Sequence, residues 1–92
     1  MAKIPAKPEE IIEAFVDDYK KTFEAELTSV ILYGSAARGE YIPKKSDINF
    51  MIVLSEEGIQ RFGKALPLVT QWKKRMVSTP LFLTPGYISS SL

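Results

Sequence analysis

Residues 32–50 read LYGSAARGEYIPKKSDINF. An apolar segment runs into Gly34 and Ser35, a polar loop follows, and a second apolar segment starts beside Asp47 and Asn49. A packed core needs none of these polar side chains, because burying them without partners costs free energy. A site that holds phosphate groups and a divalent cation would use most of them. The expected fold and the expected function both follow from this stretch.

Two strands are predicted on either side of the loop. Residues 28–33 (TSVILY) are rich in β-branched residues and are stopped by a glycine. Residues 48–54 form the second strand, and its period of two places Asp47 and Asn49 side by side on one face. Residues 35–38, after the first strand, have room for one helical turn. The opposite, buried face of the second strand would carry Ile48, Phe50, Ile52 and Leu54.

A helix is predicted from Pro8 to Phe23. Proline suits the first helical turn, where its missing N–H costs nothing. Acidic residues near the beginning and lysines near the end complement the helix dipole. The apolar face recurs at helical spacing and carries Ile11, Ile12, Phe15, Val16, Tyr19 and Phe23. Residues 1–7 are expected to be a disordered lead-in.

A second helical segment follows the second strand. Ser55 is a suitable N-cap, with two glutamates directly after it. Pro67 should kink or divide the segment, because it lacks an N–H and its ring clashes with the preceding turn. The spacing predicts that Phe62 and Trp72 lie in the core. The full apolar stripe is Ile59, Phe62, Leu66, Val69, Trp72 and Met76.

The last residues predict a third strand and another helix. Residues 79–83 have an extended pattern, and Pro80 favours an edge strand. Thr84 and Pro85 resemble an N-cap and a first-turn proline, and the sequence stops shortly afterwards. We therefore expect an N-terminal fragment of a longer protein, truncated at the C-terminus. The expected fold class is α/β (α+β), a mixed β-sheet with helices packed on it, as a single domain over residues 1–92.

The composition excludes several kinds of chemistry. The 92 residues include no cysteine and no histidine, which rules out disulfides, Cys/His zinc sites, thiol nucleophiles and histidine bases. A formal net charge of +1 gives no general attraction to nucleic acids or membrane surfaces. No apolar run reaches the length that crosses a membrane, so a cytoplasmic protein without membrane contact is expected.

Five residues around the loop form the candidate site. Gly34 allows a sharp turn and a close approach of the backbone to a ligand. Ser35 offers a hydroxyl and an N–H to an anion, and Arg38 offers a bidentate fork to a phosphate. Asp47 and Asn49 present two oxygens to one divalent cation. Each residue taken alone also fits an ordinary turn, cap or surface position, so only their order and spacing argue for a site.

In this order and spacing, the string LYGSAARGEYIPKKSDINFMIVL resembles the signature of the DNA polymerase beta-like nucleotidyltransferase superfamily, particularly its small prokaryotic members. The pattern there is Gly-Ser, two residues, Arg-Gly, a loop, and then Ser-Asp-hydrophobic-Asp on a second strand. The resemblance implies that Gly34, Ser35 and Arg38 bind nucleotide phosphates. It also implies that Asp47 and Asn49 form the catalytic, metal-binding pair. In that family, three carboxylates hold two Mg²⁺ ions.

Two departures from the family pattern bear on activity. Asn49 stands where the resemblance implies a second metal-binding aspartate, and an amide oxygen brings no negative charge to Mg²⁺. No aspartate or glutamate occurs between Thr79 and Leu92. The third carboxylate is therefore either lost or beyond the end of this chain, and we expect the second. Mg²⁺ is expected as a weakened cofactor.

Three interpretations of the function follow. The first is a nucleotidyltransferase-family domain that binds a nucleoside triphosphate with Mg²⁺ and transfers a nucleoside monophosphate to an unidentified hydroxyl acceptor, at an impaired rate. The second is a catalytically degenerate module for nucleotide sensing or protein interaction. The third is a plain α/β domain in which Ser35 and Arg38 do not converge with Asp47. An unfinished sheet edge and an exposed apolar helix face also favour a homodimer or a complex with a partner protein.

Overall fold

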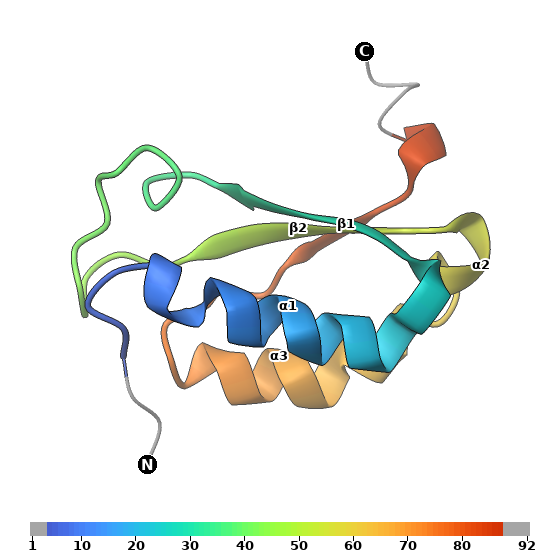
Figure 1. Cartoon of the computed structure of the whole chain (residues 1–92), viewed down its shortest axis with the longest axis horizontal. Coiled ribbons are helices and arrows are strands. Elements are labelled where there is room, and N and C mark those ends of the chain that lie inside the picture. Colours follow the sequence, from blue (N-terminus) through green and yellow to red (C-terminus); the bar gives the residue numbers. More distant parts are fainter. Residues whose placement is uncertain (1–3, 88–92) are drawn as a thin grey trace.

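Three strands form one mixed sheet in the order β1–β2–β3. β1 (Leu27–Tyr33) pairs antiparallel with β2 (Asn49–Leu54), and β2 pairs parallel with β3 (Leu81–Leu83). The structure is a computed structural model that describes residues 4–87. Figure 1 shows the sheet lying over two helices. The α+β class with a mixed sheet, predicted from the sequence, is confirmed.

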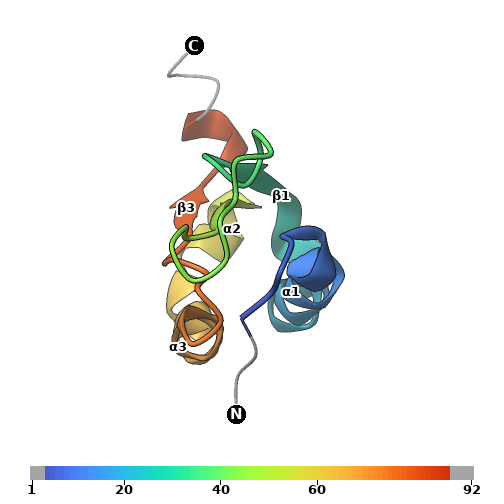
Figure 2. The ribbon, with the colours of Figure 1, turned by 90° about the vertical axis from the view of Figure 1, so that its left-hand side faces the viewer.

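The two longer helices cover the same face of the sheet. α1 (Glu9–Phe23) lies beneath the side of β1, and α3 (Leu66–Lys73) lies beneath the side of β3 (Figures 1 and 2). An aromatic cluster joins both helices to the sheet. Phe15 of α1 stacks on Phe50 of β2, with ring centroids 4.0 Å apart, and meets Trp72 of α3 edge-on at 5.4 Å. Such ring pairs stabilise by about 0.5–1.5 kcal/mol beyond the area that they bury.

Shorter helical turns connect these elements. The 3₁₀ turn η1 (Glu24–Glu26) links α1 to β1, and the 3₁₀ turn η2 (Phe62–Ala65) leads into α3. α2 (Glu56–Ile59) follows β2 directly. Its N-cap is Ser55, as predicted, because the Ser55 hydroxyl accepts a hydrogen bond from the Gly58 N–H at 3.0 Å.

The predicted patterns of α1 and β2 are confirmed. Pro8 precedes α1, the first turn is acidic, and the chain leaves the helix at Glu24, where φ is +53°. The side chains that α1 buries are Ile11, Phe15, Tyr19 and Phe23. The inward side chains at the start of β2 and along it are all buried, namely Ile48, Phe50, Ile52 and Leu54.

The segment before α1 differs from the prediction. Disorder was expected over residues 1–7, and this is wrong for residues 4–7. Pro5 is fully buried, and its carbonyl accepts a hydrogen bond from the Tyr41 hydroxyl at 2.9 Å. The prediction failed because the loop that covers this segment lies more than 30 residues further along the chain, where no local pattern reports it. Residues 1–3 lie outside the described range.

The stripe after Ser55 is not one continuous helix. Pro67 stands in the first turn of α3, so the predicted division of the segment is confirmed. The 3₁₀ turn η2 has three residues per turn rather than 3.6, and it rotates the stripe out of phase. Phe62 and Leu66 are consequently 52% and 64% exposed, which makes the core prediction for Phe62 wrong. Trp72 is 3% exposed and lies in the core as predicted.

Within residues 4–87, the sheet has two edges and one face that is exposed in part. β3 is an edge strand, as Pro80 suggested, and β1 is the other edge. On the face away from α1 and α3, Ile31, Met51 and Leu81 stand in register as a row across all three strands. Ile31 and Leu81 are exposed there.

The helix predicted after β3 begins as expected. The Thr84 hydroxyl accepts a hydrogen bond from the Tyr87 N–H at 3.1 Å, with Pro85 in the first turn. The remainder of that predicted helix lies in residues 88–92, outside the described range. Within residues 4–87, no helix combines the length and the apolar character needed to cross a membrane.

Candidate functional site

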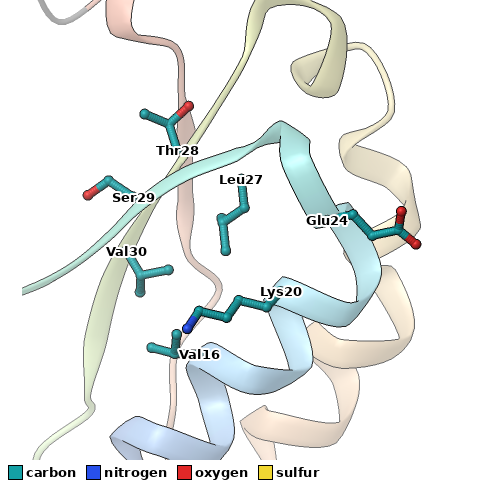
Figure 3. A pocket seen from close by; sticks show the side chains of 7 residues that line it. All are labelled: Val16, Lys20, Glu24, Leu27, Thr28, Ser29 and Val30. Atoms are coloured by element: carbon teal, nitrogen blue, oxygen red, sulfur yellow. The ribbon is translucent and has the colours of Figure 1, made fainter.

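A cavity of about 650 Å³ lies beside the outer edge of the sheet, away from the predicted site residues. Side chains of α1 and of the first half of β1 line it, including Val16, Lys20 and Leu27 (Figure 3). Gly34 follows the opposite end of β1. The cavity holds no carboxylate pair and no phosphate-binding turn, so its size is no reason to place the chemistry there.

The turn after β1 has the geometry that the sequence predicts. Gly34 has φ +81°, which only glycine adopts without strain, and it ends the strand. The carbonyls of Gly34 and Ser35 accept hydrogen bonds from the Arg38 N–H, both at 3.2 Å, which gives the expected helical turn over residues 35–38. The turn closes when the Glu40 N–H donates to the Ser35 carbonyl at 2.8 Å.

Gly39 serves this closure rather than close packing. Its φ is +76°, and a Cβ at this position would meet nothing within 4 Å. Left-handed glycine followed by a hydrogen bond back across the turn is the usual way to end a helical turn. The requirement at Gly39 is therefore conformational.

Two backbone N–H groups at the start of the turn donate no hydrogen bond among the described residues, one of them at Ala36, which is 6% exposed. Within residues 4–87, the N–H groups of Ser35 and Ala36 donate no backbone hydrogen bond, whereas those of Ala37, Arg38 and Gly39 do. The Ser35 hydroxyl also has no hydrogen-bond partner among the described residues. The first N–H groups of a helical turn attract anions, because nothing within the turn accepts from them.

Gly34 and Asn49 lie against each other. Tyr33 and Asn49 are partners in the β1–β2 register, so Gly34 continues past the Asn49 side chain. A Cβ placed on Gly34 would be 3.0 Å from the Asn49 Nδ2 atom, closer than ordinary van der Waals contact. A side chain is therefore disfavoured at position 34 by both backbone conformation and space.

Asn49 is also held from the opposite side. The Ser78 hydroxyl donates a hydrogen bond to Asn49 Oδ1 at 2.5 Å. Backbone bonds fix this contact, because the Ile48 N–H donates to the Met76 carbonyl at 2.9 Å and the Ser78 N–H donates to the Ile48 carbonyl at 3.0 Å. The start of β2 is thus joined in parallel to the segment that leads into β3.

Ser78 was not anticipated from the sequence. A signal was present, since an extended segment after a helix tends to pair in parallel with the preceding strand. Polar residues at the start of that segment would then lie near the start of β2. The exact neighbour of Asn49 depends on the register, which the sequence pattern does not specify at an irregular, proline-containing strand.

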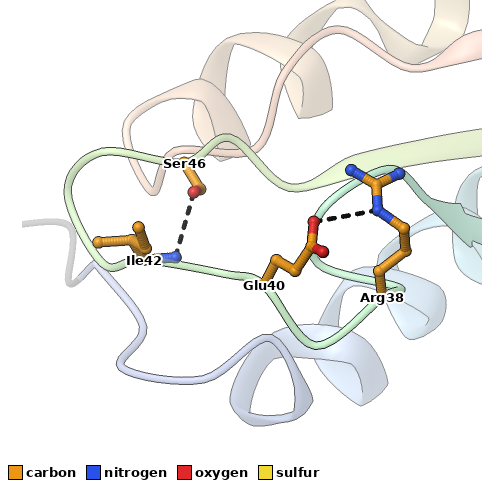
Figure 4. Close-up of polar contacts among 4 residues, drawn as sticks. All are labelled: Arg38, Glu40, Ile42 and Ser46. Atoms are coloured by element: carbon orange, nitrogen blue, oxygen red, sulfur yellow. Dashed lines mark hydrogen bonds and ion pairs between the residues drawn. The ribbon is translucent and has the colours of Figure 1, made fainter.

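Asp47 lies before β2 and is exposed. It lines a cavity of about 380 Å³ together with Lys73, Ser78 and Thr79 at the turn between α3 and β3. Ser46, directly before it, orders the preceding loop, because its hydroxyl accepts a hydrogen bond from the Ile42 N–H at 3.1 Å (Figure 4).

Arg38 projects from the same loop. Its Nε donates to Glu40 Oε1 at 3.1 Å, and both side chains are 63% exposed (Figure 4). An ion pair this exposed contributes little to stability. The pair orients the guanidinium and leaves its two terminal nitrogens for another acceptor. The structure thus brings Gly34, Asn49 and Ser78 into direct contact, while the cavity beside Asp47 is lined by neither Ser35 nor Arg38.

A sequence model for the nucleotidyltransferase domain family matches residues 9–85, from α1 through β3. The chain belongs to this family. Comparisons with curated proteins and with solved structures gave no match. As a nucleotidyltransferase domain, the chain carries the family's strand, Gly-Ser turn and second strand in the expected arrangement, and the suspected resemblance is confirmed.

Nucleotidyltransferase domains generally use divalent metal ions, and the described residues do not fit a centre of three carboxylates. No group of three or more Asp, Glu, His or Cys side chains within residues 4–87 is arranged to hold a metal ion. Asp47 is the single acid at the start of β2, and Glu40 faces Arg38. Among the described residues, the start of β2 is paired on both sides, with β1 at Tyr33 and with the segment before β3 at Val77. On the side of β2 that faces β3, the residue that contacts Asn49 is Ser78.

Proposed function

We propose that this nucleotidyltransferase domain binds a nucleoside triphosphate at the turn from Gly34 to Gly39. The phosphates would accept hydrogen bonds from the N–H groups of Ser35 and Ala36 and from the Ser35 hydroxyl. Arg38 would supply positive charge and a planar fork. The observation that carries this proposal is the pair of unbonded N–H groups at a turn that Gly34 and Gly39 keep in shape.

The reaction proposed for the family scaffold is nucleotidyl transfer. A hydroxyl oxygen of an unidentified acceptor attacks the α-phosphorus, the bond to the bridging oxygen breaks, and pyrophosphate leaves. Asp47 is the catalytic and metal-binding residue expected from the sequence, and a Mg²⁺ ion carried by the nucleotide would have Asp47 as its single carboxylate ligand here. With Asn49 in the second position, transfer by this chain should be slow, because little negative charge remains to hold a metal ion.

The contact between Asn49 and Ser78 favours a second candidate function. The chain keeps the expected phosphate-binding turn, but Asn49, at the expected second metal-binding position, takes part in a hydrogen bond between two neutral groups. This arrangement suits a module that senses a nucleotide without transferring it. Pyrophosphate release measured with each of the four ribonucleoside triphosphates separates the two. Turnover supports the transferase, and saturable binding without turnover supports the sensing module.

The binding proposal is tested with a matched pair of arginine variants. Arg38 and Arg61 are both exposed and each forms an ion pair with a glutamate, but Arg61 contacts Glu26, a partly buried side chain at the other end of the sheet. Arg38→Ala should weaken triphosphate binding about tenfold, the size of one charge-assisted contact at a solvent-exposed site. Arg61→Ala should leave the dissociation constant unchanged. Equal effects of the two variants in calorimetric titrations, or no binding by the unaltered chain, would contradict the proposal.

Two further expectations stay proposals. The row of Ile31, Met51 and Leu81, in which Ile31 and Leu81 are exposed, supports completion of the domain by additional chain, a second copy or a partner protein. Sedimentation velocity over a range of concentrations measures self-association directly. A cytoplasmic location, where nucleoside triphosphates are abundant, is likewise proposed.

A further inference from the structure

The contact with Ser78 defines how the Asn49 carboxamide is oriented. Ser78 Oγ lies 2.5 Å from Asn49 Oδ1 and 3.3 Å from the Ile48 carbonyl oxygen. Because both of these oxygens are acceptors, the hydroxyl is the donor, and the shorter contact is the one to Asn49 Oδ1. The amide nitrogen Nδ2 then points to the other side, where it lies against Gly34.

This orientation places a donor group beside the turn. Oδ1 is the atom of an asparagine that can coordinate a cation, and here one of its two lone pairs accepts from Ser78. The NH₂ group carries only donors, and within residues 4–87 it donates to no acceptor. It lies against Gly34, directly before Ser35 and Ala36, whose N–H groups are also unbonded. A donor beside such a turn suits an anion better than a metal ion.

The geometry points to a site that binds nucleotide phosphates without a divalent cation, with Asn49 as a phosphate donor and Ser78 as the residue that holds it in place. This inference rests on the proposed nucleotide binding and specifies its chemistry. Lys73 supports it, because it lines the cavity that Ser78 and Asp47 also line, and so adds a positive side chain to the cavity that holds this carboxylate. Positive side chains and amide donors would thus bind and neutralise the phosphates, as metal ions do in sites that have three carboxylates.

The first test compares nucleotide binding with and without the metal. ATP, GTP, CTP and UTP are titrated into the chain in excess EDTA and in Mg²⁺, and heat release is recorded. The dissociation constant of the best ligand should differ by less than about threefold between the two buffers. In binding free energy, this difference is smaller than the contribution of one hydrogen bond. Binding only in Mg²⁺ overturns this inference and leaves the proposed function standing. Binding in neither buffer overturns both.

The second test changes the two side chains. Asn49→Asp should weaken binding in EDTA by more than about tenfold, because a carboxylate would repel the phosphates, and Mg²⁺ should restore much of the loss. Ser78→Ala should weaken binding in EDTA about threefold to tenfold by releasing the amide, and Ser78→Thr, which keeps a hydroxyl, should recover it. Ser29→Ala, at the other end of β1, is the matched control and should have no effect. A Ser78→Ala variant that binds as tightly as the unaltered chain overturns the role assigned to Ser78.

A spectroscopic readout separates ligand contact from a purely structural role. The side-chain amide signals of Asn49 in a ¹⁵N–¹H spectrum are identified by their loss in Asn49→Asp. In EDTA, addition of the best-binding triphosphate should shift these signals along the same saturation curve as the calorimetric titration. Mn²⁺ added alone should not selectively broaden signals around Asn49. Amide signals that stay in place at saturation, or selective broadening by Mn²⁺ around Asn49, would overturn the inference.

Discussion

Replacement of Gly34 by alanine should damage the site more than replacement of Gly39, although both glycines have left-handed backbone angles. Their φ values are +81° and +76°, so both variants lose a similar free energy of about 1–2 kcal/mol from backbone conformation. The two sites differ in surroundings. A Cβ at position 39 meets nothing within 4 Å, whereas one at position 34 lies 3.0 Å from Asn49 Nδ2.

The additional loss in Gly34→Ala follows from what Asn49 contacts. Asn49 would have to move by a few tenths of an ångström to admit the added methyl group while Ser78 holds it from the other side, and overpacking of this kind costs about 1 kcal/mol or more. We therefore expect Gly39→Ala to lower the free energy of unfolding by about 1–2 kcal/mol, and Gly34→Ala by about 2–3 kcal/mol. Gly34→Ala should also weaken nucleotide binding, while Gly39→Ala should affect it less.

Urea unfolding followed by the fluorescence of Trp72, the one tryptophan in the chain, measures these differences. Trp72 lies in the core and therefore reports global unfolding. Calorimetric titration with a triphosphate provides the second readout. Equal losses of stability in the two variants, or unchanged binding in Gly34→Ala, would refute the inference that Gly34 and Asn49 form one unit.

Three further predictions concern the core. Burial, and then the negative charge of Asp18, raise the pKa of Tyr19 to about 12 from 10.0. The contribution of the protonated Tyr19 to the free energy of unfolding is therefore complete below pH 10 and is lost towards pH 12. At pH 11 the unaltered chain should have lost about 1.4 kcal/mol of this free energy, whereas Tyr19→Phe should not show this loss. Urea unfolding at pH 8 and pH 11 would detect the difference. Asp18→Ala should cost about 1–3 kcal/mol, because it removes the acceptor 3.0 Å from the Trp72 indole N–H, and an unchanged unfolding midpoint would contradict this. Phe62→Ser should cost about 1 kcal/mol or less, against about 3–5 kcal/mol for Trp72→Ala, and similar midpoints in the two variants would show that the exposed position of Phe62 is wrong.

Local chemistry made much of the fold predictable. α1 is specified by a first-turn proline and an apolar face, and β2 by an alternation that buries Phe50 and leaves Asn49 half-buried. Ser55 was identifiable as a cap because its hydroxyl needs only an N–H three residues later. These features depend on neighbours within a few residues, which a sequence pattern can report.

The wrong predictions concern residues whose burial depends on contacts with distant parts of the sequence or on a shift in the helical repeat. Pro5 is buried and bonded to Tyr41 of the loop between β1 and β2, and Phe62 is exposed because a 3₁₀ turn shifts the helical phase. At the candidate site, Gly34, Ser35 and Asn49 could be proposed from spacing alone. Ser78 could not, because its contact with Asn49 depends on the register of a parallel pair that only the folded sheet fixes.

The shortness of β3 has a consequence for motion. It pairs with β2 through three residues at the edge of the sheet, and Ser78 lies three residues before its first residue, Leu81. Short edge strands open at a lower free energy than central ones, so local opening that frees the Ser78 segment would release the Asn49 amide without unfolding the core. A ligand held by that amide would then slow amide hydrogen exchange in β3, even though none of its phosphates touches the strand.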